Sequence, residues 1–460
     1  MLKDWLKVVR HSANIMRLAW AVFYGWRRVR EASAAGCFSR GRRPQRKLLL
    51  LVWDFTGGGQ QKAALNVLKV LRREFPEWAR VIAGGQEAPG SVEMTGDLAE
   101  TQADLEGTPG ARMIRLPSLT GAPDRLADEV IYLLDLFLTE NPALIDIRSG
   151  SPIAAKIAAA MVGVPVVIHT TGGQDFRRGY PAFVEKLISG LTTAYLHNSE
   201  SGRRGWIRAG VGSLSQHQVF FHGFDLTPYQ HPDLRDRALA WRDRHGIPRD
   251  EVIIAGAGRY HVSTGFSVLL RAFAKLSEQR GRELMNNVRL MIVGGAPLNR
   301  PRTPMEIGVR QLAAELGISD RVYFVPWQDE RDVAAMYAAA DVFALSSLWG
   351  GVAGTLVRAM AAGVPVVAFD IGGTRDVLQH GQSGIVVPAG DAQALAGGIR
   401  RCLDDPKMAR AYAERARTTA GLEFGLETMR HRIGVIYRNC LRENGRTASL
   451  VEPLPAGVRR

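Results

Sequence analysis

The fold is decided by the stretch Asp341-Val-Phe-Ala-Leu-Ser-Ser-Leu-Trp-Gly-Gly-Val-Ala-Gly-Thr-Leu-Val-Arg-Ala-Met-Ala-Ala-Gly-Val-Pro-Val-Val-Ala-Phe369. It predicts an apolar strand, a glycine-rich turn, a helix that stops at Gly363 and a second apolar strand. A glycine-rich turn that opens a helix can present backbone N–H groups and the helix dipole to an anion such as a phosphate. An ordinary packing turn of a βαβ unit would produce the same pattern.

The same strand–turn–helix rhythm extends outward in two series. Apolar strands are predicted at 48–53, 80–84, 143–148 and 164–169, and a second series begins at Val252 after a connection near 232–250. A chain of 460 residues exceeds one hydrophobic core, so we expect two domains. In doubly wound sheets, ligands sit beyond the carboxyl ends of the strands. The loops at those ends are therefore the candidate site.

The N-terminal arm carries most of the net charge. Of the formal +14, residues 1–47 supply twelve Lys/Arg against two acids, which is +10 and leaves +4 for the rest. An apolar stripe with helical spacing runs beside these basic residues, and it consists of Leu2, Trp5, Leu6, Val9, Ala13, Met16, Trp20 and Phe23. The longest uncharged run, 18–26, is too short to span a bilayer.

This arm predicts that residues 1–30 lie on an anionic membrane surface. A helix packed on its own domain or on a partner would have the same pattern. Three widely spaced cysteines suit a reducing compartment. We therefore expect a cytoplasmic protein, peripheral at the inner face of the cytoplasmic membrane. The nearly balanced charge outside the arm argues against nucleic acid as a partner.

The motifs of the second half carry a resemblance. Asp341-Val-Phe-Ala-Leu-Ser-Ser, Ala359-Met-Ala-Ala-Gly363, Gly372-Gly-Thr-Arg-Asp376 and Gly381-Gln-Ser-Gly384 closely resemble the C-terminal lobe of family 4 glycosyltransferases of the GT-B fold. The resemblance covers roughly residues 47–441. It implies an α/β fold with two doubly wound, Rossmann-like lobes facing a central cleft. It also implies transfer of a sugar from a nucleotide-sugar donor, without metal or cofactor and with retention of configuration.

The expected organisation follows from this resemblance. Residues 1–47 form the basic arm and linker, 48–230 the acceptor-side lobe, and 231–423 the nucleotide-sugar lobe. Residues 424–445 form a helix that crosses back to the first lobe, and 446–460 form a tail. The acceptor is expected to be a glycan or a lipid-linked sugar, as in polysaccharide biosynthesis.

The resemblance also implies site residues. Donor-binding positions are Gly58, Gly59, Arg259, Thr264, Trp327, Gly350, Gly351, Gly354, Thr355, Arg358 and Asp376. Acceptor-side positions are Arg148, Ser149, Thr171 and Gly172, and Asp175 is the candidate catalytic residue. The family often has a histidine at the Thr171 position. His169 lies two residues away, and we interpret it as a strand residue satisfied by packing.

Three positions depart from the family pattern. Gly350 and Arg358 replace two glutamates that contact the sugar and the ribose, and Thr264 replaces a lysine that pairs with the diphosphate. Loss of one cation from a phosphate site removes about 1–3 kcal/mol. Arg358 is expected near the start of helix 355–362, where it would bind a phosphate or an acid. Two interpretations of the function remain open. The protein is an active transferase with altered donor recognition, or it is a degenerate transferase-like subunit that holds a partner enzyme.

Overall fold

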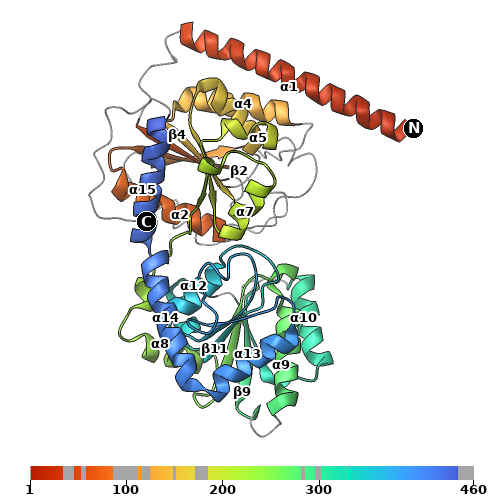
Figure 1. Cartoon of the computed structure of the whole chain (residues 1–460), viewed down its shortest axis with the longest axis vertical. Helices are drawn as coiled ribbons and strands as arrows, with labels where there is room; N and C mark the ends of the chain where they lie inside the picture. Colours follow the sequence, from red (N-terminus) through yellow and green to blue (C-terminus); the bar gives the residue numbers. More distant parts are fainter. Residues whose placement is uncertain are drawn as a thin grey trace.

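The computed structural model describes residues 2–34, 46–52, 59–85, 111–116, 125–148, 152–170, 185–280, 285–295, 302–326, 328 and 330–443. It has two lobes, each a parallel sheet flanked by helices, one above the other in Figure 1. The two-lobe α/β architecture predicted from the strand–turn–helix rhythm is confirmed.

The first lobe contains a seven-stranded parallel sheet in the order β3-β2-β1-β4-β5-β6-β7. Its strands are β1 Lys47–Val52, β2 Ala79–Gly85, β3 Ala111–Leu116, β4 Leu144–Ile147, β5 Val166–Thr170, β6 Ala194–His197 and β7 His217–Val219. In the register of the central strand, Leu48 pairs with Arg80 on one side and Leu144 on the other. The all-apolar run of β1 is explained by burial of both of its faces.

Alternation along β1 sorts its side chains between two helix layers. Leu49 and Leu51 face α4 (Leu126–Glu140) and α5 (Pro152–Val162), whereas Leu48 and Leu50 face α2 (Gly59–Glu74) and α15 (Leu426–Glu443). The helix α7 (Glu200–Arg208) and the short 3-10 helices η1 (Ser189–Leu191) and η2 (Leu214–Gln216) complete the lobe.

The second lobe contains a six-stranded parallel sheet in the order β10-β9-β8-β11-β12-β13. Its strands are β8 Val252–Ala257, β9 Val288–Val293, β10 Val322–Val325, β11 Val342–Leu345, β12 Val366–Phe369 and β13 Ile385–Val387. Its helices are α8 Leu234–Arg244, α9 Phe266–Arg280, α10 Pro304–Glu315, α11 Glu330–Ala338, α12 Gly354–Ala361, α13 Ala392–Asp404 and α14 Pro406–Phe424. The stretch from Asp341 to Phe369 forms β11, α12 and β12, and Gly363, with φ 72°, ends the helix as predicted.

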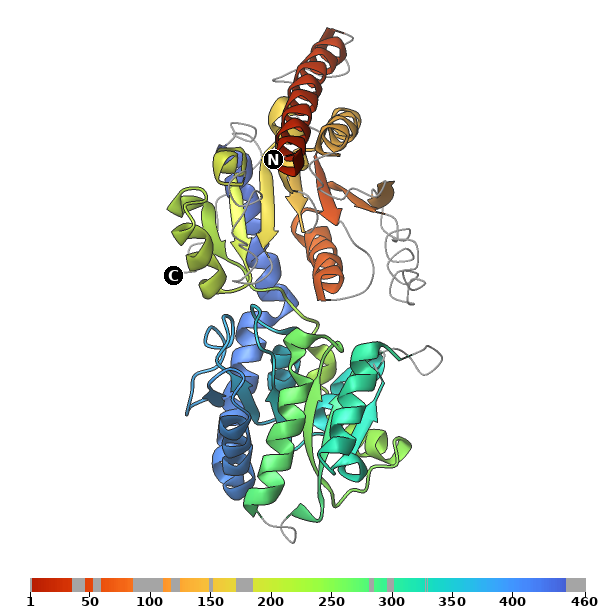
Figure 2. The same ribbon diagram turned by 90° about the vertical axis from the view of Figure 1, so that its right-hand side faces the viewer.

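The chain crosses between the lobes at two adjacent points. Phe224, which leaves the first lobe, donates its backbone N–H to Phe424 O (2.7 Å) and bridges to Gly425. From Gly425, α15 runs back onto the first lobe, where it packs against α2 (Figure 2). Glu74 of α2 pairs with Arg430 and with Arg438, and a Cβ at Gly434 between them would lie 2.4 Å from its carboxylate.

The N-terminal arm is the helix α1 (Leu2–Ala34), which lies across α4 and α5 in Figure 1. Its second half packs on the lobe: Ala21 and Val29 are buried, and Arg28 pairs with Asp135 at 3.1 Å. The packing alternative therefore accounts for this half. Trp20 and Phe23 stay 59% and 66% exposed. Within the described ranges, no helix has the length and apolarity needed to cross a membrane.

Candidate functional site between the two lobes

Two glycine-containing loops follow β11 and β12 at the carboxyl edge of the second sheet. They are in backbone contact, since a Cβ at Gly373 would lie 2.2 Å from the carbonyl carbon of Gly351. Gly350 has φ 142°, which side chains rarely allow, and a Cβ there would meet nothing within 4 Å. The predicted donor positions Gly350 and Gly351 therefore lie in a loop whose backbone conformation favours glycine at position 350.

The helix α12 begins directly after this loop, at Gly354 and Thr355. No side chain caps it at Ala353, so the first-turn N–H groups have no side-chain acceptor. Uncapped N–H groups and the helix dipole favour an anion at this end. The anion site itself stays a prediction.

The loop after β8 is held against the loop after β11. Ser346 Oγ donates to Thr264 O (2.8 Å), and Leu348 N donates to Ser263 O (2.8 Å). A Cβ at Gly265, where φ is 69°, would lie 2.0 Å from Ser346 O. These contacts bring the exposed Arg259 to the same edge as the glycine loops.

Thr264 and Arg358 are placed differently from the sequence expectation. The Thr264 hydroxyl donates to Arg259 O (2.7 Å), so it braces its own loop. Arg358 lies in the last turn of α12, because that helix is only eight residues long and ends at Ala361, and the expectation that it lies near the start is wrong. Its guanidinium stands over the Phe224 ring at 5.8 Å, and a cation suits the C-terminal end of a helix.

Asp376 reaches across to the first lobe. Its Oδ2 accepts the backbone N–H of Glu200, the first residue of α7, at 2.7 Å. Burial, with the charge of Glu200 adding to it, raises the pKa of Asp376 above its ordinary value. Asp376 therefore helps to cap α7, alongside Ser199, whose Oγ accepts from Gly202 N.

The turn between β6 and α7, residues Asn198 to Glu200, meets the glycine loop directly. Val352 N donates to Asn198 O at 3.4 Å. A Cβ at Gly351 would lie 2.2 Å from Asn198 Oδ1. Sequence analysis missed Asn198, and its only signal was a position just beyond the carboxyl end of a predicted strand.

On the acceptor side, Arg148 follows β4 and is buried. Its Nε and Nη2 donate to Asp146 Oδ2 (3.2 and 2.8 Å), and Nη2 lies 2.8 Å from His169 Nε2. Tyr437 of α15 also donates to Asp146. Burial opposes the charge on Asp146, but Arg148 and then His169 hold the pKa of that carboxyl below its ordinary value. His169 lies in β5, as predicted.

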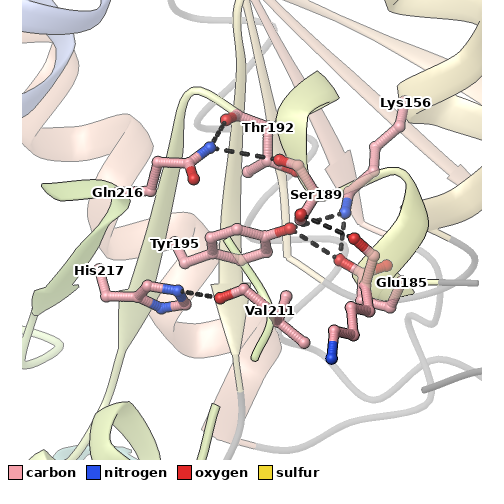
Figure 3. A network of polar contacts seen from close by, with 9 residues as sticks. Lys156, Glu185, Ser189, Thr192, Tyr195, Val211, Gln216 and His217 are labelled. Atoms are coloured by element: carbon pink, nitrogen blue, oxygen red, sulfur yellow. Dashed lines mark hydrogen bonds and ion pairs between the residues drawn. The ribbon is translucent and has the colours of Figure 1, made fainter. Parts of the chain in front are cut away.

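A second buried polar network lies away from these loops (Figure 3). Lys156 of α5 pairs with Glu185, and its Nζ donates to Tyr195 OH at 3.0 Å. Gln216 Nε2 donates to Ser189 O (3.2 Å) and to Thr192 O, which ties η2 to η1. Burial lowers the pKa of Lys156. These bonds hold the segment from Glu185 onto α5, so we assign the network to the scaffold.

Several predicted site residues lie outside the described part of the chain. They are Gly58, Ser149, Thr171, Gly172, Asp175 and Trp327. Gly59 is described and begins α2. Across the described residues there is no group of three His, Cys, Asp or Glu arranged to hold a metal ion.

Comparison with known proteins matches residues 238–419 to the family described as glycosyl transferases group 1. The matched residues lie in the second lobe, from α8 to α14. The D-inositol 3-phosphate glycosyltransferases of Streptomyces avermitilis and Mycolicibacterium smegmatis are 33% and 37% identical over 232 and 207 residues. These alignments cover 50% and 44% of this chain, and 48% and 44% of the relatives, about half of their length.

Solved structures extend the likeness to both lobes. HepE of Anabaena in complex with UDP-glucose superimposes with a TM-score of 0.68 at 21% identity, covering 85% of this chain and 99% of that one. Sucrose-phosphate synthase of Thermosynechococcus elongatus gives 0.67 at 21%, covering 86% and 99%. The chain therefore shares the GT-B fold, with two lobes that are each built on a parallel sheet.

Proposed function

We propose that this chain transfers a sugar from a nucleotide-sugar donor to a glycan or lipid-linked acceptor, without a metal ion and with retention of configuration. The observation that carries the proposal is the edge of the second sheet, where α12 begins without a side-chain cap and the loop that carries Arg259 is bonded to the loop after β11. Backbone N–H groups and one guanidinium there suit the departing diphosphate.

The relatives and neighbours support the donor class. The curated relatives are named glycosyltransferases, and HepE was crystallised with UDP and with UDP-glucose. The donor domain is also the part that matches the family. We assign the diphosphate to the second lobe, the acceptor to the first, and the reaction to the region between them, on the side of Arg148, Ser149, Thr171, Gly172 and the candidate catalytic Asp175.

We further propose that the protein works in the cytoplasm at an anionic membrane surface, through residues 1–30, in polysaccharide assembly. Trp20 and Phe23 are exposed on the side of α1 that does not pack on the lobe, with Arg27 and Arg30 exposed nearby. Aromatic rings and basic side chains on one helix face suit the interface of an anionic bilayer.

A second candidate is a degenerate transferase-like subunit that holds a partner enzyme. This candidate is favoured because three predicted donor residues make other contacts. Thr264 braces its loop, Arg358 stacks on Phe224, and Asp376 caps α7. The test is a calorimetric titration of the full chain with UDP, GDP and ADP and with UDP-glucose, GDP-mannose and ADP-glucose. Micromolar binding of one pair supports the transferase, and no binding by any of them supports the subunit.

A further inference from the structure

The donor loop of the second lobe has two neighbouring glycines, Gly350 and Gly351. At Gly350, where the resemblance places a sugar-binding glutamate, a Cβ would meet no described residue within 4 Å, and φ 142° disfavours any side chain. At Gly351 the Cβ position is filled by the carboxamide of Asn198, with Oδ1 at 2.2 Å and Nδ2 at 2.6 Å. Because Gly351 has no side chain, it admits a polar group from the opposite lobe into the donor loop.

Asn198 is held in this place by contacts on both sides of it. Its carbonyl accepts Val352 N at 3.4 Å, and Asp376 accepts Glu200 N at 2.7 Å. Ser201, one turn further on, lies against Gly372, where a Cβ would approach Ser201 Oγ to 3.2 Å. The β6–α7 turn is thus seated on both glycine loops, and its side chains have a fixed relation to the donor loop.

We propose that Asn198, which lies against Gly351 and next in the loop to the predicted sugar contact at position 350, recognises the sugar of the donor. The inference rests on the proposed transferase function. A carboxamide has two N–H donors and an oxygen acceptor, so it can bind a sugar hydroxyl in either direction. It carries no charge, so it fits a neutral hexose better than an acidic sugar. Because Asn198 belongs to the first lobe, sugar recognition requires the two lobes to be together.

The experiment separates binding of the sugar from binding of the nucleotide. Calorimetry measures Kd for UDP and UDP-glucose, GDP and GDP-mannose, and ADP and ADP-glucose, and the pair that binds the unmodified chain is carried forward. Asn198→Ala is expected to weaken binding of the nucleotide sugar about three- to tenfold, as for one lost hydrogen bond, and to leave the free nucleotide unchanged. Asn198→Asp, which restores an acceptor, should recover most of the loss.

Two further variants test the geometry. Gly351→Ala should displace the carboxamide and weaken nucleotide-sugar binding like Asn198→Ala, but should add nothing in the Asn198→Ala background. Ser201→Ala, in the same turn, is the matched control and should leave both Kd values unchanged. Melting temperatures with and without free nucleotide show whether each variant is folded.

The outcomes distinguish the two proposals. If one pair binds and Asn198→Ala changes nucleotide and nucleotide sugar alike, or changes neither, the role of Asn198 is overturned and the transferase proposal stands. An additive effect of Gly351→Ala in the Asn198→Ala background would also overturn it. If no nucleotide or nucleotide sugar binds the unmodified chain, the proposed function fails and the inference falls with it.

Discussion

At the scale of single residues, two arginines of the second lobe have different surroundings. Arg259 is exposed beside the glycine loops, at the carboxyl edge of the sheet, whereas Arg358 is half-buried over Phe224 at the far end of α12. A guanidinium that faces the open edge can pair with a phosphate. One stacked on an aromatic ring at a helix C-terminus instead stabilises the fold.

We therefore predict opposite effects of two substitutions. Arg259→Ala should lose about 1–3 kcal/mol of nucleotide affinity with little change in unfolding free energy. Arg358→Ala should lose less than about 0.5 kcal/mol of that affinity and about 0.5–1 kcal/mol of stability. Calorimetry and urea unfolding measure the two quantities. Equal losses of affinity in both variants would contradict this assignment and return Arg358 to the phosphate site.

Buried histidines make the stability depend on pH. Burial lowers the pKa of His169, His217 and His222, and it lowers that of His197, with help from His217, to about 3. The unfolded chain binds protons near pH 6.5, where the folded protein does not, so stability is full above that pH and is lost as pH falls. At pH 5 each histidine that stays neutral costs about 2 kcal/mol.

We predict that His197→Gln reduces this loss. Between pH 7 and pH 5, its unfolding free energy should fall by about 2 kcal/mol less than that of the unmodified chain. Urea unfolding at both pH values measures the difference. His261→Gln, at an exposed position, is the control for the substitution itself. Parallel curves for His197→Gln and the unmodified chain would refute the prediction.

At the scale of elements, α15 is fixed to the first lobe by one acid between two arginines. The Glu74 carboxylate is nearly buried and pairs with Arg430 and Arg438, whereas Glu427, 69% exposed, pairs only with Arg430. An exposed ion pair contributes little, but removal of one partner from a buried set leaves a charge without compensation. The two acids thus offer a matched comparison around a single arginine.

Glu74→Gln should destabilise the protein by about 2–4 kcal/mol, and Glu427→Gln by less than about 0.5 kcal/mol. Hydrogen exchange should show faster opening of α15 in Glu74→Gln, because the helix would lose its main polar attachment. Urea unfolding gives the free energies. Equal small effects in both variants would mean that apolar packing of Tyr437 and its neighbours fixes the helix unaided.

At the scale of the whole molecule, one side of α1 packs on the first lobe and another side is exposed. Residues from Ala21 onward pack on α4 and α5, so deletion of the whole arm would expose the lobe as well as remove a membrane contact. The exposed side of the helix can be tested without that damage. Leu422 and Ile307 of the second lobe are also exposed, at 68% and 45%. Substitutions there serve as the control for the loss of exposed apolar side chains outside α1.

We predict that Trp20→Ser with Phe23→Ser weakens sedimentation with vesicles containing anionic lipid about tenfold or more, from the lost apolar burial. Leu422→Ser with Ile307→Ser should leave it unchanged. High salt should weaken binding of the unmodified chain, since basic residues attract the anionic surface. Equal sedimentation of the two double variants would contradict membrane attachment through α1.

The sequence by itself determined most of the strands and helices and their order, but it predicted neither β3 nor α14. The helical and the strand periodicities depend on residues that are close together in the chain. The continuous apolar runs of β1 and β11 likewise indicate strands that are buried on both faces. Glycines such as Gly363 also report their own backbone conformation. The resemblance to a known family also predicted the loops of the donor site, because each of its motifs consists of residues that are close together in the chain.

Only the tertiary structure decided which side chains meet. Asn198 and Gly351 are separated by 153 positions, and Asp376 and Glu200 by 176, so no local signal connects them. Their contact depends on how two separately folded sheets face each other. Likewise, the charge of Arg358 was evident from the sequence, but its place over Phe224 depends on where α12 begins and on the path between the lobes. Contacts across a lobe interface are set by packing of whole domains, and one-dimensional patterns do not carry that information.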